Sequence, residues 1–438
     1  MNPARLTIAG FALAAALGTG LLMLPEAARD GRGTDVVTAL FTAVSALCVT
    51  GLVVVDTAGF WSGFGQVVVL VLIQVGGFGI MALASLLGVL VARRLGLRGQ
   101  LAAAAETKTL TPGDVRLILV GVARTSLVVE AATAVLLAAR FATGYGEPLP
   151  RALWLGVFHS VSAFNNAGFA LWGDSLTRFA TDPWICLPIT AAVVVGGLGF
   201  PVLFELRRHL RRPSRWSLHT KLTLLGSAVL LVAGPVMVWL LEWRNPGTLG
   251  SLSVPGKLLA GFFQGVMPRT AGFNSVDIAQ MNSGTWLGTD VLMFIGGGSA
   301  GTAGGIKVTT FAVLLLLIVS EVRGDEDATA FGRTLPRGLH RQALTVALLG
   351  VGAVVASTMA LLTTTRFSLD QVLYEVVSAF ATVGLSTGIT AQLPTGGQLL
   401  LVALMFLGRT GTITLATALA LRSRPRLYQL PAERAIVG

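Results

Sequence analysis

The stretch Ser378-Ala-Phe-Ala-Thr-Val-Gly-Leu-Ser386 predicts a short helix that runs into an extended segment, Thr382-Val383-Gly384. A similar stretch occurs three more times, and each copy places a Gly six residues after its first residue and follows it with Leu or Phe. The other copies are Ser45-Ala-Leu-Cys-Val-Thr-Gly-Leu52, Ser162-Ala-Phe-Asn-Asn-Ala-Gly-Phe169 and Val266-Met-Pro-Arg-Thr-Ala-Gly-Phe273. The chain therefore contains an internal repeat, which centres on Gly51, Gly168, Gly272 and Gly384.

One copy alone would indicate only a turn glycine with positive φ. Four copies in similar apolar settings indicate more, because a residue without a Cβ lets the backbone stay extended with its carbonyls turned toward a common axis. Rings of such carbonyl oxygens can replace the water around a bare cation. The repeat therefore predicts an ion filter that four segments of one chain build together.

The composition predicts an integral membrane protein in a lipid bilayer. Of the 438 residues, 53% are hydrophobic and only 12% are charged, against about 25% charged in a soluble domain. The net charge of +11 does not indicate nucleic acid as a partner, because the basic residues form short clusters between apolar spans, as the positive-inside rule expects. Cys48 and Cys186 lie far apart in apolar segments and have no metal-type spacing.

We expect an all-α integral membrane fold of four helix–pore helix–helix repeats, with eight transmembrane helices in a pseudo-fourfold arrangement around one pore. The repeats are expected at residues 1–98, 99–215, 216–324 (with a broken outgoing helix and an intramembrane loop) and 325–423, followed by a short cytoplasmic tail at 424–438. The first apolar span, Leu6 to Pro25, is long enough to cross about 30 Å of hydrocarbon. A signal peptide is the alternative, and the length of the span favours a retained helix.

The same pattern places the individual helices. The expected incoming helices after the first are Leu117–Ala139, Leu222–Leu241 and Gln342–Thr365. The expected pore helices are Asp35–Leu47, Arg151–Ala163, Pro255–Val266 and Asp370–Phe380. The expected outgoing helices are the second half of Thr57–Ala92, then Pro183–Phe204, Asp290–Ser320 and Gln398–Leu421. We expect Asp35, Asp290 and Asp370 to be N-caps.

Basic residues predict the orientation. The linkers after the first two repeats hold Arg93, Arg94, Arg98, Lys108 and Arg116, then six Lys or Arg from Arg207 to Lys221, and the connections on the other side hold fewer. Both termini of this multi-pass cell-membrane protein are therefore predicted to be cytoplasmic, with the filter-bearing loops entering from outside. Non-helical backbone at that depth is tolerated only where it is buried in protein or lines a water-filled path.

A second glycine motif recurs in the outgoing helices. Its copies are Gly76-Gly77-Phe-Gly79, Gly196-Gly197-Leu-Gly199, Gly296-Gly297-Gly-Ser299 and Gly408-Arg409-Thr-Gly411. For the first two, close helix packing is the simpler interpretation. The third has six glycines in ten positions, which is too costly for a regular helix, so we expect a mid-membrane loop that gates the path. The predicted gate comprises Gly296, Gly297, Gly298, Ser299, Ala300, Gly301, Thr302, Ala303, Gly304 and Gly305.

Two basic residues belong to the predicted gate. Arg409 lies in the middle of its apolar span, where a charge normally faces a cavity or a partner. It forms a structural ion pair with Glu130 or Glu375, or it limits ion occupancy and speeds ion release from beside the path, and both can be true at once. Lys307 either anchors the glycine loop or extends to the cytoplasmic surface.

The remaining ionisable residues have simpler interpretations. Glu130 could serve in a proton or cation relay, but pairing with Arg124 or Arg409 is favoured. Asp56 and Asp174, just after the first two filters, could concentrate cations at the mouth. The four histidines, His159, His209, His219 and His340, have no metal-ligand spacing.

Together, the four repeats, the single Gly in each filter, the Gly-rich third outgoing helix and the Gly408-Arg409-Thr-Gly411 run resemble the Trk/Ktr/HKT superfamily of potassium transporters over nearly the whole chain. The sequence starts directly with the first repeat, without the extra N-terminal helices of Trk-type subunits, so it is most similar to the Ktr-type membrane subunit. Gly51 is what a potassium-selective member has in its first filter; a Ser there would have suggested sodium transport.

The resemblance implies a homodimer with one pore per protomer, and a cytoplasmic ring of nucleotide-binding regulatory subunits that acts on the mid-membrane loop. It implies potassium as the transported ion and sodium as a second, stimulating ion. By position, the filter carbonyls would come from Val49, Thr50 and Gly51; Asn166, Ala167 and Gly168; Thr270, Ala271 and Gly272; and Thr382, Val383 and Gly384. The inner edge would be Cys48, Asn165, Arg269 and Ala381. Only Thr382-Val383-Gly384 matches the Thr-Val-Gly core of tetrameric potassium channels.

Two alternatives remain open. The first is a less selective sodium or ammonium pathway. The second is a membrane-embedded enzyme, against which the sequence offers no His-Glu-x-x-His, no nucleophile elbow and no clustered carboxylate pair. There is no phosphate-binding loop either, so nucleotide control would reside on a partner. We therefore expect no enzymatic activity.

Overall fold

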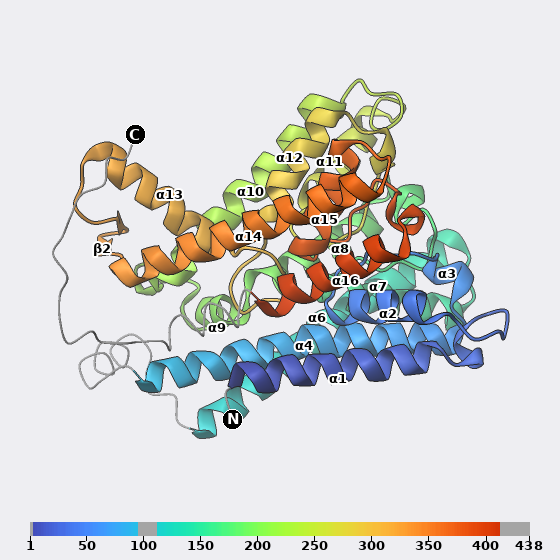
Figure 1. The fold of residues 1–438 in the computed structure, drawn as a ribbon, viewed down its shortest axis with the longest axis horizontal. Helices are drawn as coiled ribbons and strands as arrows, with labels where there is room; N and C mark the ends of the chain where they lie inside the picture. The colour runs from blue at the N-terminus through green and yellow to red at the C-terminus, as the bar shows by residue number, and fades with distance from the viewer. Residues whose placement is uncertain (1–2, 95–111, 412–438) are drawn as a thin grey trace.

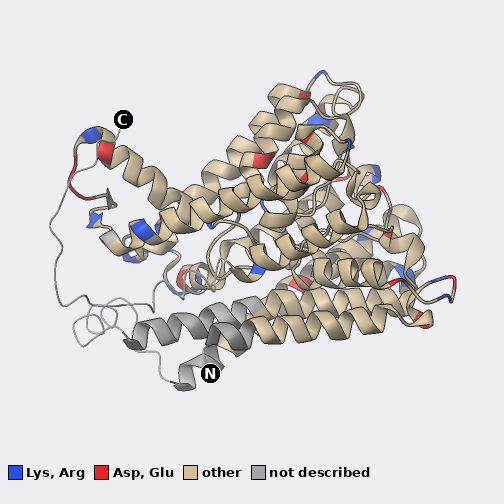
Figure 2. Ribbon diagram, in the orientation of Figure 1, with Lys and Arg blue, Asp and Glu red and all other residues tan. Residues whose placement is uncertain are grey.

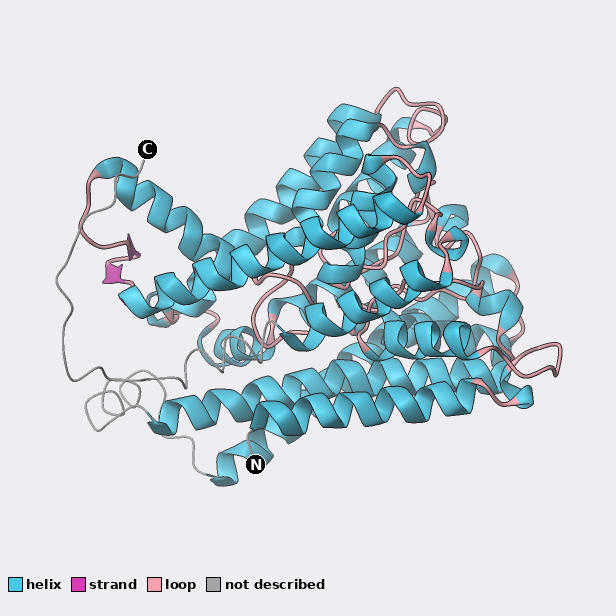
Figure 3. Cartoon of the chain, in the orientation of Figure 1, coloured by secondary structure: helices cyan, strands magenta, loops and turns pink. Residues whose placement is uncertain are grey.

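The computed structural model describes residues 3–94 and 112–411, and the chain in these ranges is mostly helical (Figure 3). The first quarter consists of α1 (Pro3–Leu22), η1 (Pro25–Ala27), α2 (Val36–Leu47), α3 (Thr57–Phe60) and α4 (Gly63–Arg94). The helices α1 and α4 lie side by side, and α2 packs against both (Figure 1). Asp35 caps α2 and accepts a hydrogen bond from the Thr38 N–H, which confirms this predicted N-cap.

The second quarter of the chain contains a sharp bend that was not predicted from the sequence. It consists of α6 (Pro112–Tyr145), α7 (Leu149–Phe164), η2 (Thr177–Phe179), α8 (Pro183–Leu198), α9 (Phe200–His209) and η3 (Pro213–Arg215). The predicted continuous helix Pro183–Phe204 is wrong, because α8 and α9 meet at 98°. The bend falls at Gly199, which has a φ of 90°. Glycine adopts this angle readily, and other residues rarely do.

In the third quarter of the chain, two short helices take the place of one continuous outgoing helix. It consists of α10 (Leu218–Glu242), α11 (Val254–Val266), η4 (Ile278–Gln280), α12 (Ser283–Phe294) and α13 (Val308–Arg323). Residues 295–307 between α12 and α13 are irregular, and Ile295 and Ile306 pair in an isolated parallel bridge. Asn282 occupies the N-cap of α12, so the predicted N-cap Asp290 is wrong and lies inside the helix.

The fourth quarter follows a small antiparallel hairpin of β1 (Thr329–Ala330) and β2 (Arg333–Thr334). It consists of α14 (Arg337–Thr364), α15 (Leu369–Ala381), η5 (Thr390–Gln392), α16 (Thr395–Phe406) and a π-helical turn, η6 (Leu407–Gly411). Ser368 caps α15 in a capping box with Gln371, so the predicted N-cap Asp370 is wrong and lies in the first turn. The predicted continuation of α16 to Leu421, the tail at 424–438 and the boundary between residues 98 and 99 lie outside the described residues.

The surface of the described helices suits a membrane. Three of them are long and apolar enough to cross a bilayer, at Leu119–Tyr145, Leu218–Glu242 and Gly338–Thr364, or four if the bent α8–α9 pair is one span. Large apolar side chains on these outer helices are exposed, with Leu240 at 77%. Charged residues lie mainly toward the two ends of the molecule (Figure 2). The buried core lies around the four short helices α2, α7, α11 and α15.

Candidate functional site

The four repeat glycines meet at one place. A Cβ added to each glycine would collide with the carbonyl oxygen of the residue just before another repeat glycine, and the four contacts close into a ring. Starting from Gly51 and taken in chain order, these distances are 2.3 Å to the oxygen of Ala167, 2.8 Å to that of Ala271, 2.4 Å to that of Val383 and 2.0 Å to that of Thr50. Only glycine therefore fits at these four positions.

The four segments also share one backbone conformation. Positive φ angles occur at Val49, Asn166, Thr270 and Thr382, and again two residues later at each repeat glycine. The residue between has a negative φ, so the hand of the backbone alternates. In a regular strand successive carbonyls point to opposite sides, whereas this alternation turns them to the same side. The predicted fully extended Thr382-Val383-Gly384 is therefore wrong at Thr382, which has φ 51° and ψ 55°.

The N–H groups of these segments are bonded back toward the short helices. The Thr50 N–H donates to the Ser45 carbonyl (2.8 Å), and the Val383 N–H donates to the Ser378 carbonyl (2.9 Å). In the same two copies the glycine N–H reaches the serine Oγ, at 3.2 Å for Gly51 and 3.0 Å for Gly384. This serine was not among the predicted site residues, although it opens three of the four repeats. Because these N–H groups already donate to the short helices, the carbonyls of the same segments remain available to a ligand.

The short helices direct their C-terminal ends at the same place. The helices α2, α7, α11 and α15 end at Leu47, Phe164, Val266 and Ala381, immediately before the segments that carry the glycines. The C-terminus of a helix carries a partial negative charge from its unpaired carbonyls. Four such ends around one ring favour a cation there.

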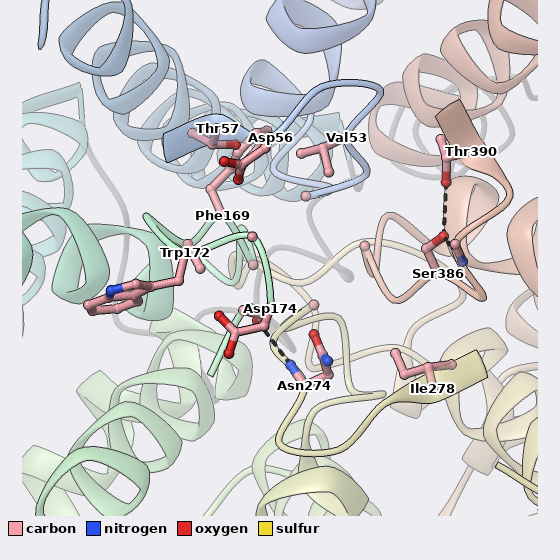
Figure 4. Close-up of a pocket in the computed structure, with 18 of the residues that line it drawn as sticks. Val53, Asp56, Thr57, Phe169, Trp172, Asp174, Asn274, Ile278, Ser386 and Thr390 are labelled. Atoms are coloured by element: carbon pink, nitrogen blue, oxygen red, sulfur yellow. Dashed lines mark hydrogen bonds between the residues drawn. The ribbon is translucent and has the colours of Figure 1, made fainter. Parts of the chain in front are cut away.

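A cavity of about 650 Å³ opens beside the ring and is lined by all four repeat glycines (Figure 4). Its walls come from four separate stretches of the chain and include Asp56 and Asp174, which Figure 4 labels, together with Asp277. Asp56 and Asp174 were predicted at this mouth, whereas Asp277 was missed. Burial would raise the pKa of Asp174, but hydrogen bonds from Arg178 and Thr177 and the charge of Arg178 outweigh it, so the pKa lies below its ordinary value. This carboxylate therefore stays charged at neutral pH.

On the other side of the ring, the irregular segment between α12 and α13 touches two of the four repeat segments. The Thr302 hydroxyl lies 3.1 Å from Asn166 Oδ1 in the second segment. A Cβ added at Gly304 would lie 1.8 Å from Thr382 Oγ1 in the fourth. Since the contacts around the ring place the second and fourth segments opposite each other, the segment between α12 and α13 extends across one end of the ring.

Arg409 binds this segment and not a carboxylate. Its side chain is buried and donates to the Thr302 carbonyl and, at 3.3 Å, to the Gly76 carbonyl of α4. The predicted ion pair with Glu130 or Glu375 is wrong within the described residues, where no carboxylate lies within salt-bridge distance of Arg409.

The carboxylates of Glu130 and Glu375 accept hydrogen bonds from uncharged polar groups. Glu130 accepts hydrogen bonds from Gln74 and Asn165, so its predicted pairing with Arg124 or Arg409 is also wrong among the described contacts. Glu375 accepts hydrogen bonds from Ser386, Thr387 and Thr390.

Lys307 is turned into the segment between α12 and α13. Its Nζ donates to the carbonyls of Ala303 and Gly304, at 2.5 and 3.4 Å. These are the contacts that the anchoring alternative expects. A side chain that extended to the cytoplasmic surface would not make these two contacts.

The predicted inner-edge residues have different surroundings. Cys48 is buried and free, and the Asn165 side chain turns outward to Gln74 and Glu130. Arg269 donates to Ser227 Oγ of α10 at 2.9 Å. Ala381 lies directly against the segment between α12 and α13, where it faces Gly305.

The outgoing-helix glycines allow close helix packing. A Cβ added at Gly76, Gly196 or Gly408 would lie 1.8, 1.9 or 1.8 Å from the carbonyl oxygen of Leu47, Phe164 or Phe380. The helix-contact interpretation is therefore confirmed for the first two copies, and the fourth copy packs in the same way.

A ring of glycines and carbonyls at the ends of four buried helices, inside an apolar helical bundle, defines a membrane transport protein. Residues 7–426 match the TrkH family, described as cation transport protein. The chain belongs to this family, and it is therefore a transporter and not an enzyme.

Three similar proteins narrow the class. The chain is 40% identical to Ktr system potassium uptake protein B of Bacillus subtilis, over 96% of this chain and 93% of that protein. It is 34% identical to the potassium/sodium uptake protein NtpJ of Enterococcus hirae, over 100% and 98%. The crystal structure of the potassium transporter TrkH from Vibrio parahaemolyticus has the same fold, with a TM-score of 0.75 at 18% identity over 94% of this chain and 84% of that one. The chain is a Ktr-type membrane subunit.

Proposed function

We propose that this protein takes up potassium across the cell membrane and that the ion passes through the ring of the four repeat glycines. The observation that carries the proposal is the closed set of glycine–carbonyl contacts, because it gathers backbone oxygens where a dehydrated cation needs them. The names of the relatives, which are potassium or potassium/sodium uptake proteins, support the choice of ion. Filter carbonyls come from the four predicted triplets that end at Gly51, Gly168, Gly272 and Gly384.

The architecture of this proposal has eight transmembrane helices in four pseudo-fourfold repeats, with both termini in the cytoplasm. The acidic cavity is then the external mouth, and the segment 296–305, with Lys307 and Arg409, is the gate on the inner side of the filter. The working unit is a homodimer that a cytoplasmic ring of nucleotide-binding subunits controls. A Ktr-type membrane subunit implies a regulatory partner. Sodium acts as a stimulating second ion, in keeping with the name of NtpJ as a potassium/sodium uptake protein.

The test is rubidium uptake into lipid vesicles that contain the purified full-length chain. We expect a downhill rubidium flux that potassium competes away far more effectively than sodium or ammonium. Equal competition by the three ions would support the less selective pathway instead. Measurement with and without sodium tests the stimulation, and the absence of any flux above that of empty vesicles would contradict the proposal.

Arg409→Gln should raise the unregulated rubidium flux about tenfold. The change removes a charged donor from the Thr302 and Gly76 carbonyls, and a hydrogen bond to a charged group is worth about 1.5–3 kcal/mol. The closed position of the gate loses this stabilisation. Arg151→Gln, which removes a surface ion pair with Glu147, is the control for a lost arginine. A flux that stays at the wild-type level with normal protein yield would contradict a gating role.

The triple variant Asp56→Asn, Asp174→Asn and Asp277→Asn should slow rubidium uptake severalfold at low ionic strength. The three carboxylates line one cavity and raise the local cation concentration, and salt screens this effect. Asn retains the acceptor oxygen by which each Asp holds its own loop. The difference from wild type should shrink when N-methylglucamine chloride raises the ionic strength. A deficit that does not depend on salt would rule out the electrostatic explanation.

A further inference from the structure

Thr302 makes contacts in several directions from the middle of the segment 296–305. Its side chain is buried, with 1% exposed. Its backbone N–H donates to the Gly196 carbonyl of α8 at 3.2 Å, and its carbonyl accepts from Arg409. Its hydroxyl lies 3.1 Å from Asn166 Oδ1 and 3.3 Å from the Phe164 carbonyl at the end of α7. One residue therefore joins the gate, Arg409 and the second filter segment.

Asn166 extends this connection to a second part of the filter. It lies two residues before Gly168, with φ 60°, a conformation that Asn tolerates better than most residues. Its Nδ2 donates to the Arg269 carbonyl at the start of the third filter segment, at 3.4 Å. Its amide oxygen meanwhile faces the Thr302 hydroxyl. The side chain of Asn166 therefore bridges the gate and the third filter segment.

The surroundings leave little room for another partner. A Cβ added at Gly196 would lie 3.0 Å from Thr302 Oγ1 and 3.1 Å from Asn166 Oδ1, so even a methyl group would crowd the pair. Asn166 is 1% exposed. If the segment 296–305 moves away, the Asn166 amide loses its donor in a buried position, which is costly unless the amide reorients.

We propose that the Thr302–Asn166 hydrogen bond couples the gate to the ion selectivity of the filter. With the gate in place, Thr302 holds Asn166, and Asn166 holds the second and third filter segments at a set spacing. When the gate leaves, the two segments are freer to close around a smaller ion, and discrimination between potassium and sodium falls. Thr302 is a positioning residue, since it acts through Asn166. The inference rests on the proposed function, because it assigns a regulation to the same filter.

The test compares the ability of potassium and of sodium to compete with rubidium uptake into vesicles. Thr302→Val keeps the shape of the side chain and removes the hydroxyl. It should lower the potassium-over-sodium preference about fivefold, the effect expected for the loss of one neutral hydrogen bond. Thr302→Ser should retain the wild-type preference. Thr309→Val is the matched control: it removes the contact between Ser299, nearer the start of the same segment, and Thr309 of α13.

The possible outcomes separate the coupling from the gate and from the transport itself. An unchanged preference in Thr302→Val overturns the coupling even if the flux rises, and so does an equal loss in Thr309→Val. If Thr302→Val does not fold, Thr302→Ala removes the same hydroxyl and is judged in the same way. Adding Asn166→Ala to Thr302→Val should lower the preference no further than the stronger single change, whereas additive losses would overturn the coupling. Failure of the proposed function is a separate result, the absence of rubidium flux in wild type.

Discussion

Gly272→Ala should lower rubidium uptake by roughly two orders of magnitude. The added Cβ would lie 2.4 Å from the Val383 carbonyl oxygen and 2.9 Å from the Cα of Gly168, and both neighbours are backbone atoms of other filter segments. Overpacking of this kind costs about 1–3 kcal/mol, and each 1.4 kcal/mol is a factor of about ten. Because the strain falls on the carbonyl ring itself, we expect it to appear as lost flux.

Gly332→Ala is the matched control for this variant. Gly332 has the same φ of 74° as Gly272, so both substitutions impose the same backbone strain. Nothing lies within 4 Å of a Cβ added at Gly332, which is in the hairpin between β1 and β2. We expect near wild-type uptake from Gly332→Ala. Similar losses in the two variants would mean that backbone strain alone explains the effect, which would contradict the role of the ring.

Deletion of residues 300–304 should raise the unregulated rubidium flux at least about tenfold, since each 1.4 kcal/mol taken from the closed state changes the open population tenfold. These residues carry the contacts of the gate with Asn166 and with Thr382, in opposite filter segments. They also include the carbonyls that hold Lys307 and Arg409. The deletion therefore removes the proposed obstruction together with the contacts that keep it in place. Rubidium uptake into vesicles measures the result.

The control for the deletion is the flux of N-methylglucamine through the same vesicles. A large organic cation cannot pass a carbonyl ring of ionic dimensions, so its leak should stay at the wild-type level. A parallel rise in both fluxes would mean that the bundle has been opened nonspecifically. An unchanged rubidium flux from well-folded protein would contradict the gate, while the ring of glycines would stand as a separate proposal.

The short helices were the most predictable part of the fold. Caps and periodic apolar residues act locally, so Asp35 and the end of α2 at Leu47 could be read directly from the chain. The predicted caps Asp290 and Asp370 failed for the opposite reason. Asn282 and Ser368 stand earlier in the chain and start α12 and α15 first, which leaves the two acids inside their helices. Local signals do not say which of two nearby polar residues begins a helix.

The partners of the buried charges were the least predictable part of the site. Opposite charge favoured Glu130 or Glu375 for Arg409, but the guanidinium donates to backbone carbonyls from two other quarters of the chain. An irregular segment such as the one that contains Thr302 leaves backbone carbonyls without helical partners. The residue types do not reveal where such carbonyls will lie. The bend at Gly199 has the same origin. A Cβ there would lie 2.3 Å from the Ser299 carbonyl, so the close approach of a segment distant in sequence requires a glycine.

The sequence alone determined that the chain is a membrane protein and that four glycine segments are equivalent, because apolar content and internal repetition are properties of residue types and their spacing. The tertiary structure decided that the four glycines meet in a ring, that Thr302 reaches Asn166, and that Arg409 holds the loop and not a carboxylate. These contacts join residues from different quarters of the chain through backbone atoms, which every residue has. Residue identity therefore cannot reveal them, and only the folded arrangement brings them together.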